Sequence, residues 1–107
     1  MLDIVRIRKA VDAQGPRFIR RIYTENEISS FPGRKPTLHY ALNFSFKESF
    51  WKTLPEGIQK RTYFRDIEII WKREKPGILH FGTPVKNVSL IFAANNEIVM
   101  TAVIKRD

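Results

Sequence analysis

The amino-acid sequence predicts an α+β fold in which N-terminal helices and a long central helix pack on a small antiparallel sheet. Two observations lead to this prediction. Residues 37–53 contain no glycine or proline and are apolar around most of a helical circumference, which is typical of a helix at the centre of a domain. Residues 64–104 contain short runs rich in isoleucine, valine and aromatic residues, which favour strands. Helices followed by strands indicate an α+β layer architecture.

Three short helices are predicted before the central one. Apolar residues recur at helical spacing within residues 3–13, and a second apolar run covers residues 18–22. A third helix is expected to begin near Thr24, because Thr24 and Glu27 have the spacing of a capping box. Glycine and proline mark the ends of the helices, at Gly15, Pro16, Pro32, Gly33, Pro55 and Gly57.

Four strands are expected in the second half of the chain, over residues 64–71, 78–81, 88–93 and 98–104. The turn residues between them are Lys75-Pro76-Gly77, Gly82-Thr83-Pro84 and Asn95-Asn96. Because the connections are short, the strands are expected to form an antiparallel meander.

Composition limits the classes of function. With 107 residues, the chain is expected to form a single domain over residues 1–107 with a modest core. It has no cysteine, which excludes disulfides and any thiolate metal site or thiol nucleophile. No run of eighteen apolar residues and no secretory signal is evident, so we expect no membrane span and a cytoplasmic location.

The chain is basic. Nineteen Lys and Arg residues against eleven Asp and Glu give a formal charge of +8, which attracts nucleic acids, anionic cofactors or acidic proteins. Six of the basic residues lie within the first 21 positions, against two acidic residues. An ordinary solvated helix face is the alternative interpretation of this cluster. Nucleic-acid binding has only the charge in its favour and is not expected.

The segment from Phe44 to Lys52 is the most informative part of the sequence. It places the carboxylate of Glu48 between Lys47 and Lys52, while Asp3 offers a second carboxylate from a distant segment. Two carboxylates that share a metal ion beside two ammonium groups suggest phosphate chemistry. The alternatives are a weak surface ion pair between Glu48 and Lys52, and an Asp3 that caps the first helix.

Further landmarks follow in a fixed order along nearly the whole chain: Asp3-Ile4-Val5, Arg17-Phe18, Arg21-Ile22-Tyr23-Thr24, Lys47-Glu48 with Lys52, Arg65-Asp66-Ile67-Glu68-Ile69, and Val88-Ser89-Leu90. This series resembles the holo-acyl-carrier-protein synthases, which are the short 4'-phosphopantetheinyl transferases. The resemblance implies a 4'-phosphopantetheinyl transferase-like fold. It also implies transfer of the phosphopantetheine arm of coenzyme A to a serine of an acidic acyl carrier protein.

The resemblance assigns roles to individual residues. Asp3 and Glu48 would bind Mg, and the carrier serine would lose its proton to Glu48 or to a metal-bound water. Lys47 and Lys52 would contact phosphate oxygens, with Lys52 also counted among the catalytic residues. Ser89 belongs to the implied coenzyme A site. Three basic residues would meet the carrier protein: Lys9, Arg17 and Arg21. The resemblance further implies a homotrimer with active sites between subunits.

The sequence also departs from the family pattern. Leu42-Asn43 stands where the family has Gly-Arg, and Ile91-Phe92 replaces a Ser-His pair on the late strand. No strand is evident before Asp3. These differences remove groups expected to bind coenzyme A. A non-catalytic module that binds carrier proteins is therefore an alternative to an active transferase, with Arg17, Arg20 and Arg21 as its binding residues.

Overall fold

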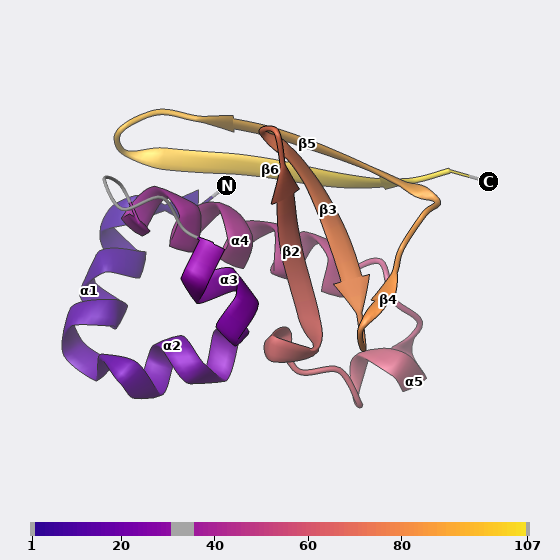
Figure 1. The fold of residues 1–107 in the computed structure, drawn as a ribbon, viewed down its shortest axis with the longest axis horizontal. Coiled ribbons are helices and arrows are strands. Elements are labelled where there is room, and N and C mark those ends of the chain that lie inside the picture. Colours follow the sequence, from indigo (N-terminus) through magenta and orange to yellow (C-terminus); the bar gives the residue numbers. More distant parts are fainter. Residues whose placement is uncertain (1, 31–35, 107) are drawn as a thin grey trace.

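The computed structural model describes residues 2–30 and 36–106 and has the predicted α+β architecture (Figure 1). The helices are α1 (Ile4–Gln14), α2 (Pro16–Ile22), α3 (Glu25–Ser30), α4 (Pro36–Trp51) and α5 (Glu56–Gln59), with a 3-10 turn η1 (Phe64–Asp66). The strands are β1 (Leu2–Asp3), β2 (Ile67–Lys72), β3 (Lys75–His80), β4 (Thr83–Pro84), β5 (Val88–Ala94) and β6 (Ile98–Lys105).

Local side-chain contacts fix the starts of the N-terminal helices. Asp3 caps α1, since its Oδ1 accepts a hydrogen bond of 2.8 Å from the Val5 amide. The predicted capping box is present: the Thr24 amide donates to Glu27 Oε1 at 3.0 Å, and the Glu27 amide donates to Thr24 Oγ1 at 3.1 Å. Gly15 joins α1 to α2 at a φ of 55°, a conformation that glycine adopts without strain.

The strands form two three-stranded antiparallel sheets, so the single meander predicted from sequence is wrong. One sheet has the order β1-β6-β5 and the other β2-β3-β4. Leu2 and Asp3, just before α1, also form a strand that the sequence did not reveal, in which Leu2 pairs with Val99 and Asp3 with Ile98. Two residues carry too little periodicity for a strand to be recognised.

Two boundaries in the second sheet differ from the prediction. The Lys75-Pro76-Gly77 segment lies within β3, and the turn between β2 and β3 is made instead by Arg73 and Glu74 at φ values of 50° and 66°. Neither residue is a strong turn signal, because glycine and asparagine are the usual occupants of this backbone region. Residues 64–66 form η1 rather than the start of β2.

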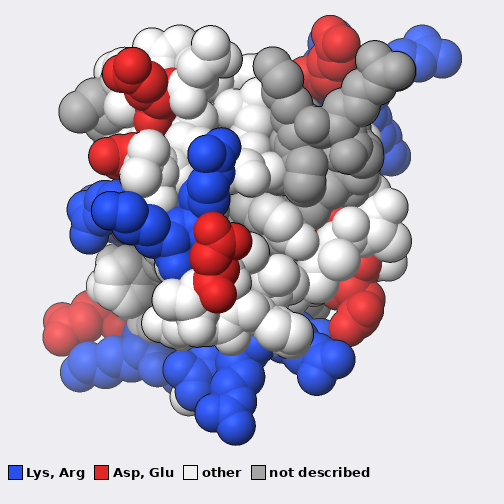
Figure 2. Space-filling view, turned by 90° about the vertical axis from the view of Figure 1, so that its left-hand side faces the viewer, with Lys and Arg blue, Asp and Glu red and all other residues white. Residues whose placement is uncertain are grey.

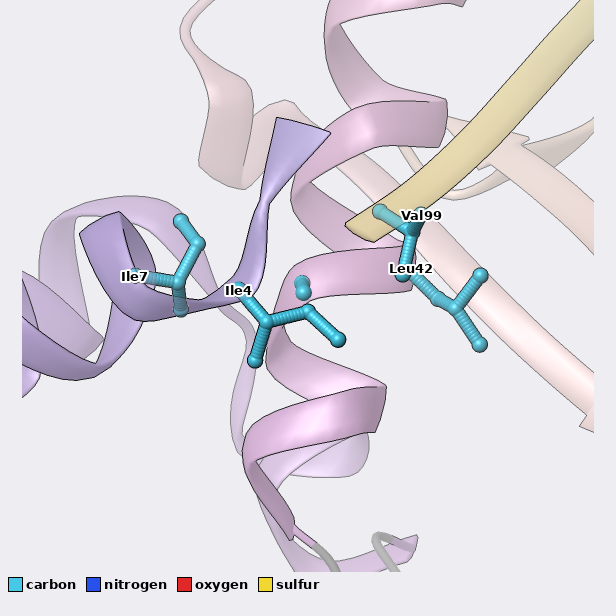
Figure 3. Packing of buried hydrophobic residues seen from close by; sticks show 5 residues of the cluster. Ile4, Ile7, Leu42 and Val99 are labelled. Atoms are coloured by element: carbon cyan, nitrogen blue, oxygen red, sulfur yellow. The ribbon is translucent and has the colours of Figure 1, made fainter. Parts of the chain in front are cut away.

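Helix α4 is buried on two sides, as predicted for the central helix. On one side Ala41 and Leu42 pack with Ile4, Ile7 and Val99 (Figure 3). On the other side the second cluster consists of Phe46, Phe50, Ile67, Ile69 and Ile78. Burial of each large side chain stabilises the fold by about 1.5–3 kcal/mol relative to leaving it exposed. Both clusters therefore depend on the position of α4.

A buried ion pair connects α3, α4 and η1. Lys47 and Glu27 are both fully buried, and Lys47 Nζ lies 2.6 Å from Glu27 Oε1. Lys47 Nζ also donates to the carbonyl of Phe64 at 3.0 Å and to the carbonyl of Ile67. Burial raises the pKa of Glu27 and lowers the pKa of Lys47, while their mutual attraction opposes both shifts. The contact is thus needed to keep these groups in the interior.

Asn43 extends this network to β2. Its amide nitrogen donates to Glu27 Oε2 at 2.8 Å, and its Oδ1 accepts a hydrogen bond of 2.8 Å from the Trp71 indole. The asparagine that replaces a family arginine in the sequence is therefore a buried structural residue here. Both Glu27 carboxylate oxygens are hydrogen-bonded, which offsets the cost of burying the charge.

The buried ion pair between Glu27 and Lys47 leads to a prediction about stability. Lys47→Met keeps the volume of the side chain but removes the positive charge beside the buried Glu27 carboxylate and one donor to each of two carbonyl groups, so the free energy of unfolding should fall by about 3–5 kcal/mol. Urea denaturation measures this change. Lys60→Met is the matched control, because Lys60 is in an exposed pair with Glu56 and its loss should change stability little. Equal stability of both variants would contradict the role given to Lys47.

A second prediction concerns pH. His80 accepts or donates a 3.2 Å hydrogen bond with Thr62 and stacks on Phe81, and burial lowers its pKa in the folded state from 6.5 despite the nearby Asp66. As the pH falls below 6.5, the unfolded chain binds a proton at His80 more readily than the folded one, so stability should fall. Urea denaturation between pH 8 and 5 should show a smaller decrease for His80→Gln. Parallel curves for parent and variant would refute this.

Candidate functional site

Glu48 and Lys52 form an exposed ion pair at the end of α4. Lys52 Nζ lies 3.2 Å from Glu48 Oε1, and the side chains are 67% and 48% exposed, respectively. Among the described side chains of α4, residues 37–51, Glu48 is the only exposed one. The other side chains of residues 37–51 are buried or half-buried, so Glu48 offers a carboxylate to a ligand from a packed helix.

Asp3 lies where β1 meets α1, and it is exposed. Its role as helix cap uses Oδ1 and is compatible with a second role as metal ligand. Within residues 2–30 and 36–106, no group of three or more His, Cys, Asp or Glu side chains could hold a metal ion. Two exposed carboxylates suit Mg, which takes few protein ligands and completes its shell with water and substrate phosphates.

Lys47 does not lie at this site. The sequence placed it beside Lys52 as a phosphate contact, but the structure directs its ammonium group into the interior against Glu27 and two carbonyls. This prediction is corrected, because a fully buried lysine with three partners has no donor left for a substrate. Nothing in the local sequence distinguishes the two lysines, since Glu27 lies twenty residues away.

Ser89 lies on the face of its sheet that points away from α4. Its neighbour Leu90 packs into the second core cluster, and alternation along a strand directs Ser89 to the opposite side. Ser89 pairs with Ile104, whereas Thr101 on the inner face contacts Ser45 of α4 at 2.7 Å. Within a single chain, Ser89 therefore lies on the opposite side of the sheet from Glu48 and Lys52.

The three basic residues expected to meet a carrier protein are all exposed. Lys9 lies on α1, and Arg17 and Arg21 lie on α2 together with exposed Arg20. Figure 2 shows this side of the molecule, where lysine and arginine side chains gather along the lower edge, at the level of α2 in Figure 1. The N-terminal cluster of basic residues thus forms a positively charged surface.

A hollow of about 580 Å³ adjoins this surface and was not anticipated from sequence. It is lined by Arg21 and Ile22 of α2, by Tyr63, and by the three residues of η1. The segments that form it are more than forty residues apart in the sequence, so no local pattern predicts it. In the part of the chain that the structure describes, no helix has the length and apolar character needed to span a membrane.

Comparison with known proteins shows which family the sequence matches. The family model of the 4'-phosphopantetheinyl transferase superfamily matches residues 2–103. A holo-[acyl-carrier-protein] synthase of Carboxydothermus hydrogenoformans is 34% identical over 87 residues, which cover 80% of this chain and 70% of the relative. A holo-[acyl-carrier-protein] synthase of Listeria monocytogenes is 33% identical over 97 residues, which cover 88% of this chain and 80% of the relative.

A solved structure supports the same assignment. The crystal structure of holo-[acyl-carrier-protein] synthase from Neisseria meningitidis superposes with a TM-score of 0.82 at 27% identity, and the match covers 99% of this chain and 93% of that one. The resemblance found in the sequence is therefore confirmed, and so is the fold that it implied. The chain belongs to the 4'-phosphopantetheinyl transferase superfamily.

Proposed function

We propose that this protein transfers the 4'-phosphopantetheine arm of coenzyme A to a serine of an acyl carrier protein in an Mg-dependent reaction. The observation that best supports this proposal is the exposed Glu48-Lys52 pair on a helix that is otherwise packed into the core. The relatives named holo-[acyl-carrier-protein] synthase support the substrates.

Asp3 and Glu48 are the residues proposed to hold Mg. When bound, the ion would neutralise the diphosphate of coenzyme A and polarise the phosphorus under attack. Because Asp3 is fixed as a helix cap and Glu48 stands on a packed helix, both carboxylates are held in place before a ligand arrives. Such preorganisation lowers the cost of assembling the site.

Lys52, Glu48 and solvent are proposed to bind the phosphate and to accept the proton of the serine. Lys52 is exposed and is held one helical turn from Glu48, so its ammonium group can bind a phosphate oxygen of coenzyme A. The serine hydroxyl of the carrier attacks the phosphorus, and its proton passes to Glu48 or to a water molecule. Adenosine 3',5'-bisphosphate leaves.

A homotrimer would complete the coenzyme site. The outer face of the β5–β6 sheet exposes an apolar set of side chains: Ile91, Ala93, Met100, Ala102 and Ile104. Ser89 lies on the same face, away from Glu48 of its own chain. We propose that neighbouring subunits cover this face, and that Ser89 of one subunit thereby contributes to a coenzyme site shared between subunits.

The non-catalytic carrier-binding module remains the second candidate because of Asn43 and Phe92. Both replace polar residues of the family pattern, and both have packing roles here: Asn43 binds Glu27, and the Phe92 ring lies 5.3 Å from the Trp71 ring. The cytoplasmic location stays a prediction. Activity measurements separate the two candidates.

The first functional prediction concerns the carboxylates. Glu48→Gln and Asp3→Asn should each lower the rate of arm transfer at least about a hundredfold, since each removes a charge proposed to bind Mg. Mass spectrometry of an apo carrier protein incubated with coenzyme A and Mg measures the transfer. Asparagine also caps helices well, so Asp3→Asn should leave stability unchanged.

The control for this experiment is Glu56→Gln, which alters another exposed glutamate one turn from a lysine. It should transfer the arm at the parent rate. Full activity of Glu48→Gln would contradict the assignment of Glu48. A parent protein that binds the carrier but never adds the arm would favour the non-catalytic module.

The trimer gives a further prediction. Ile91→Glu places a charge in the centre of the apolar outer face and should convert a trimer of 12.6 kDa chains into monomers. Analytical ultracentrifugation measures the mass. Phe81→Glu is the control, because Phe81 is an equally exposed apolar residue beside the other sheet. A parent protein that sediments as a monomer would refute the proposal.

A further inference from the structure

We propose that Thr101 is a positioning residue for the carboxylates that bind the metal. Its hydroxyl bonds two serines of α4, Ser45 and Ser49, and so fixes where this helix sits on β6. The separation of Glu48 on α4 from Asp3 on β1 follows from that placement. This inference rests on the proposed function and adds a residue that acts on the site without touching the substrate.

The two carboxylates belong to different elements that meet on β6. Asp3 is attached to the start of this strand: it pairs with Ile98, and the Ile4 amide donates to the Glu97 carbonyl at 2.8 Å. Glu48 belongs to α4, which packs along the same strand (Figure 1). The distance between the carboxylates therefore depends on the position of α4 along β6.

Thr101 makes a polar contact where α4 meets β6. Its Oγ1 lies 2.7 Å from Ser45 Oγ and 3.0 Å from Ser49 Oγ. A hydroxyl group can donate one hydrogen bond and accept two, so a single threonine can bond both serines. Ser45 and Ser49 are one helical turn apart, and Glu48 lies between them in the sequence. The turn that carries Glu48 is thus held to β6 at both of its ends.

The neighbouring contacts of β6 constrain the position of α4 less sharply. Val99 belongs to the first core cluster and Val103 packs against the second, so alternation along the strand places Thr101 between them on the inner face. Apolar burial has no preferred direction, whereas a hydrogen bond weakens steeply when its geometry changes. Thr101 therefore adds a directional constraint between two apolar contacts.

A second polar contact holds the end of α4 to the same strand. Lys105, the last residue of β6, donates from Nζ to the Thr53 carbonyl at 2.7 Å. A cation suits this place, because the carbonyl end of a helix carries a partial negative charge. Thr53 directly follows Lys52, which is proposed to contact phosphate. Thr101 and Lys105 thus hold α4 beside each of its two proposed site residues.

A small displacement of α4 is enough to matter for the proposed site. Mg tolerates little departure from octahedral geometry, so carboxylates from two elements must be placed closely in advance. Groups that orient metal ligands without binding the metal typically change metal affinity or activity by about 10- to 100-fold when they are lost. We therefore expect the Thr101 hydroxyl to affect metal binding more than it affects carrier binding.

The test removes the hydroxyl of Thr101 and keeps the branched shape. Thr101→Val should raise the Kd for Mn²⁺, a probe that takes the same carboxylate ligands as Mg, about tenfold. The electron paramagnetic resonance signal of free Mn²⁺ measures this Kd in the presence of coenzyme A, with coenzyme A alone as the blank. The Mg concentration for half-maximal arm transfer should rise by the same factor, while the KM for the carrier protein stays at the parent value.

Two further variants separate positioning from a general loss of stability. Thr62→Val makes the same change at a buried threonine, whose hydroxyl donates to the Ile58 carbonyl at 2.8 Å and bonds His80 at 3.2 Å. It should lower stability in urea as Thr101→Val does, yet bind Mn²⁺ like the parent. Thr101→Ser restores the hydroxyl and should return the Kd for Mn²⁺ close to the parent value.

The outcomes separate this inference from the proposed function. Parent-like Mn²⁺ binding by Thr101→Val, or an equal loss of binding in Thr62→Val, would overturn the positioning role even if the parent transfers the arm. Weaker Mn²⁺ binding by Thr101→Val, together with a parent that binds the ion but never transfers the arm, would support the positioning role and overturn the catalytic proposal. A parent that binds no Mn²⁺ would overturn both the metal site and the role of Thr101.

Discussion

The fold depends on the buried ion pair between Glu27 and Lys47. Lys47 reaches from α4 to the carbonyls of Phe64 and Ile67, while Glu27 of α3 also binds Asn43. Two charges are removed from water at this point, so only their mutual attraction and their further hydrogen bonds make the arrangement tolerable. The pair fixes the rotation of α4 about its own axis and anchors η1 against it.

The rotation of α4 about its axis determines which of its side chains are exposed to solvent and can bind a ligand. With Lys47 turned inward, Glu48 is the exposed side chain among residues 37–51 of α4, and Lys52 lies beside it one turn later. The same pair holds the η1 wall of the hollow through the Phe64 carbonyl. One interior contact thus supports both the carboxylate proposed to bind Mg and the wall of the hollow beside the basic surface.

The sequence predicted the helices well because their signals are local. The capping box of Thr24 and Glu27 and the apolar run of α4 each lie within one element. It misplaced Lys47, because the partner that buries this lysine lies on another helix. It also missed the division into two sheets and the turn at Arg73 and Glu74, since long-range pairing and positive φ values at non-glycine residues leave no local pattern.

A crystal structure with coenzyme A and Mg bound tests the central claim most directly. We expect Asp3 and Glu48 to converge on the ion and Lys52 to contact the diphosphate, while Lys47 Nζ stays on Glu27 and the Phe64 carbonyl. A Lys47 side chain that leaves Glu27 and binds a phosphate oxygen would contradict the account, because the interior pair would then be part of the substrate site rather than its support.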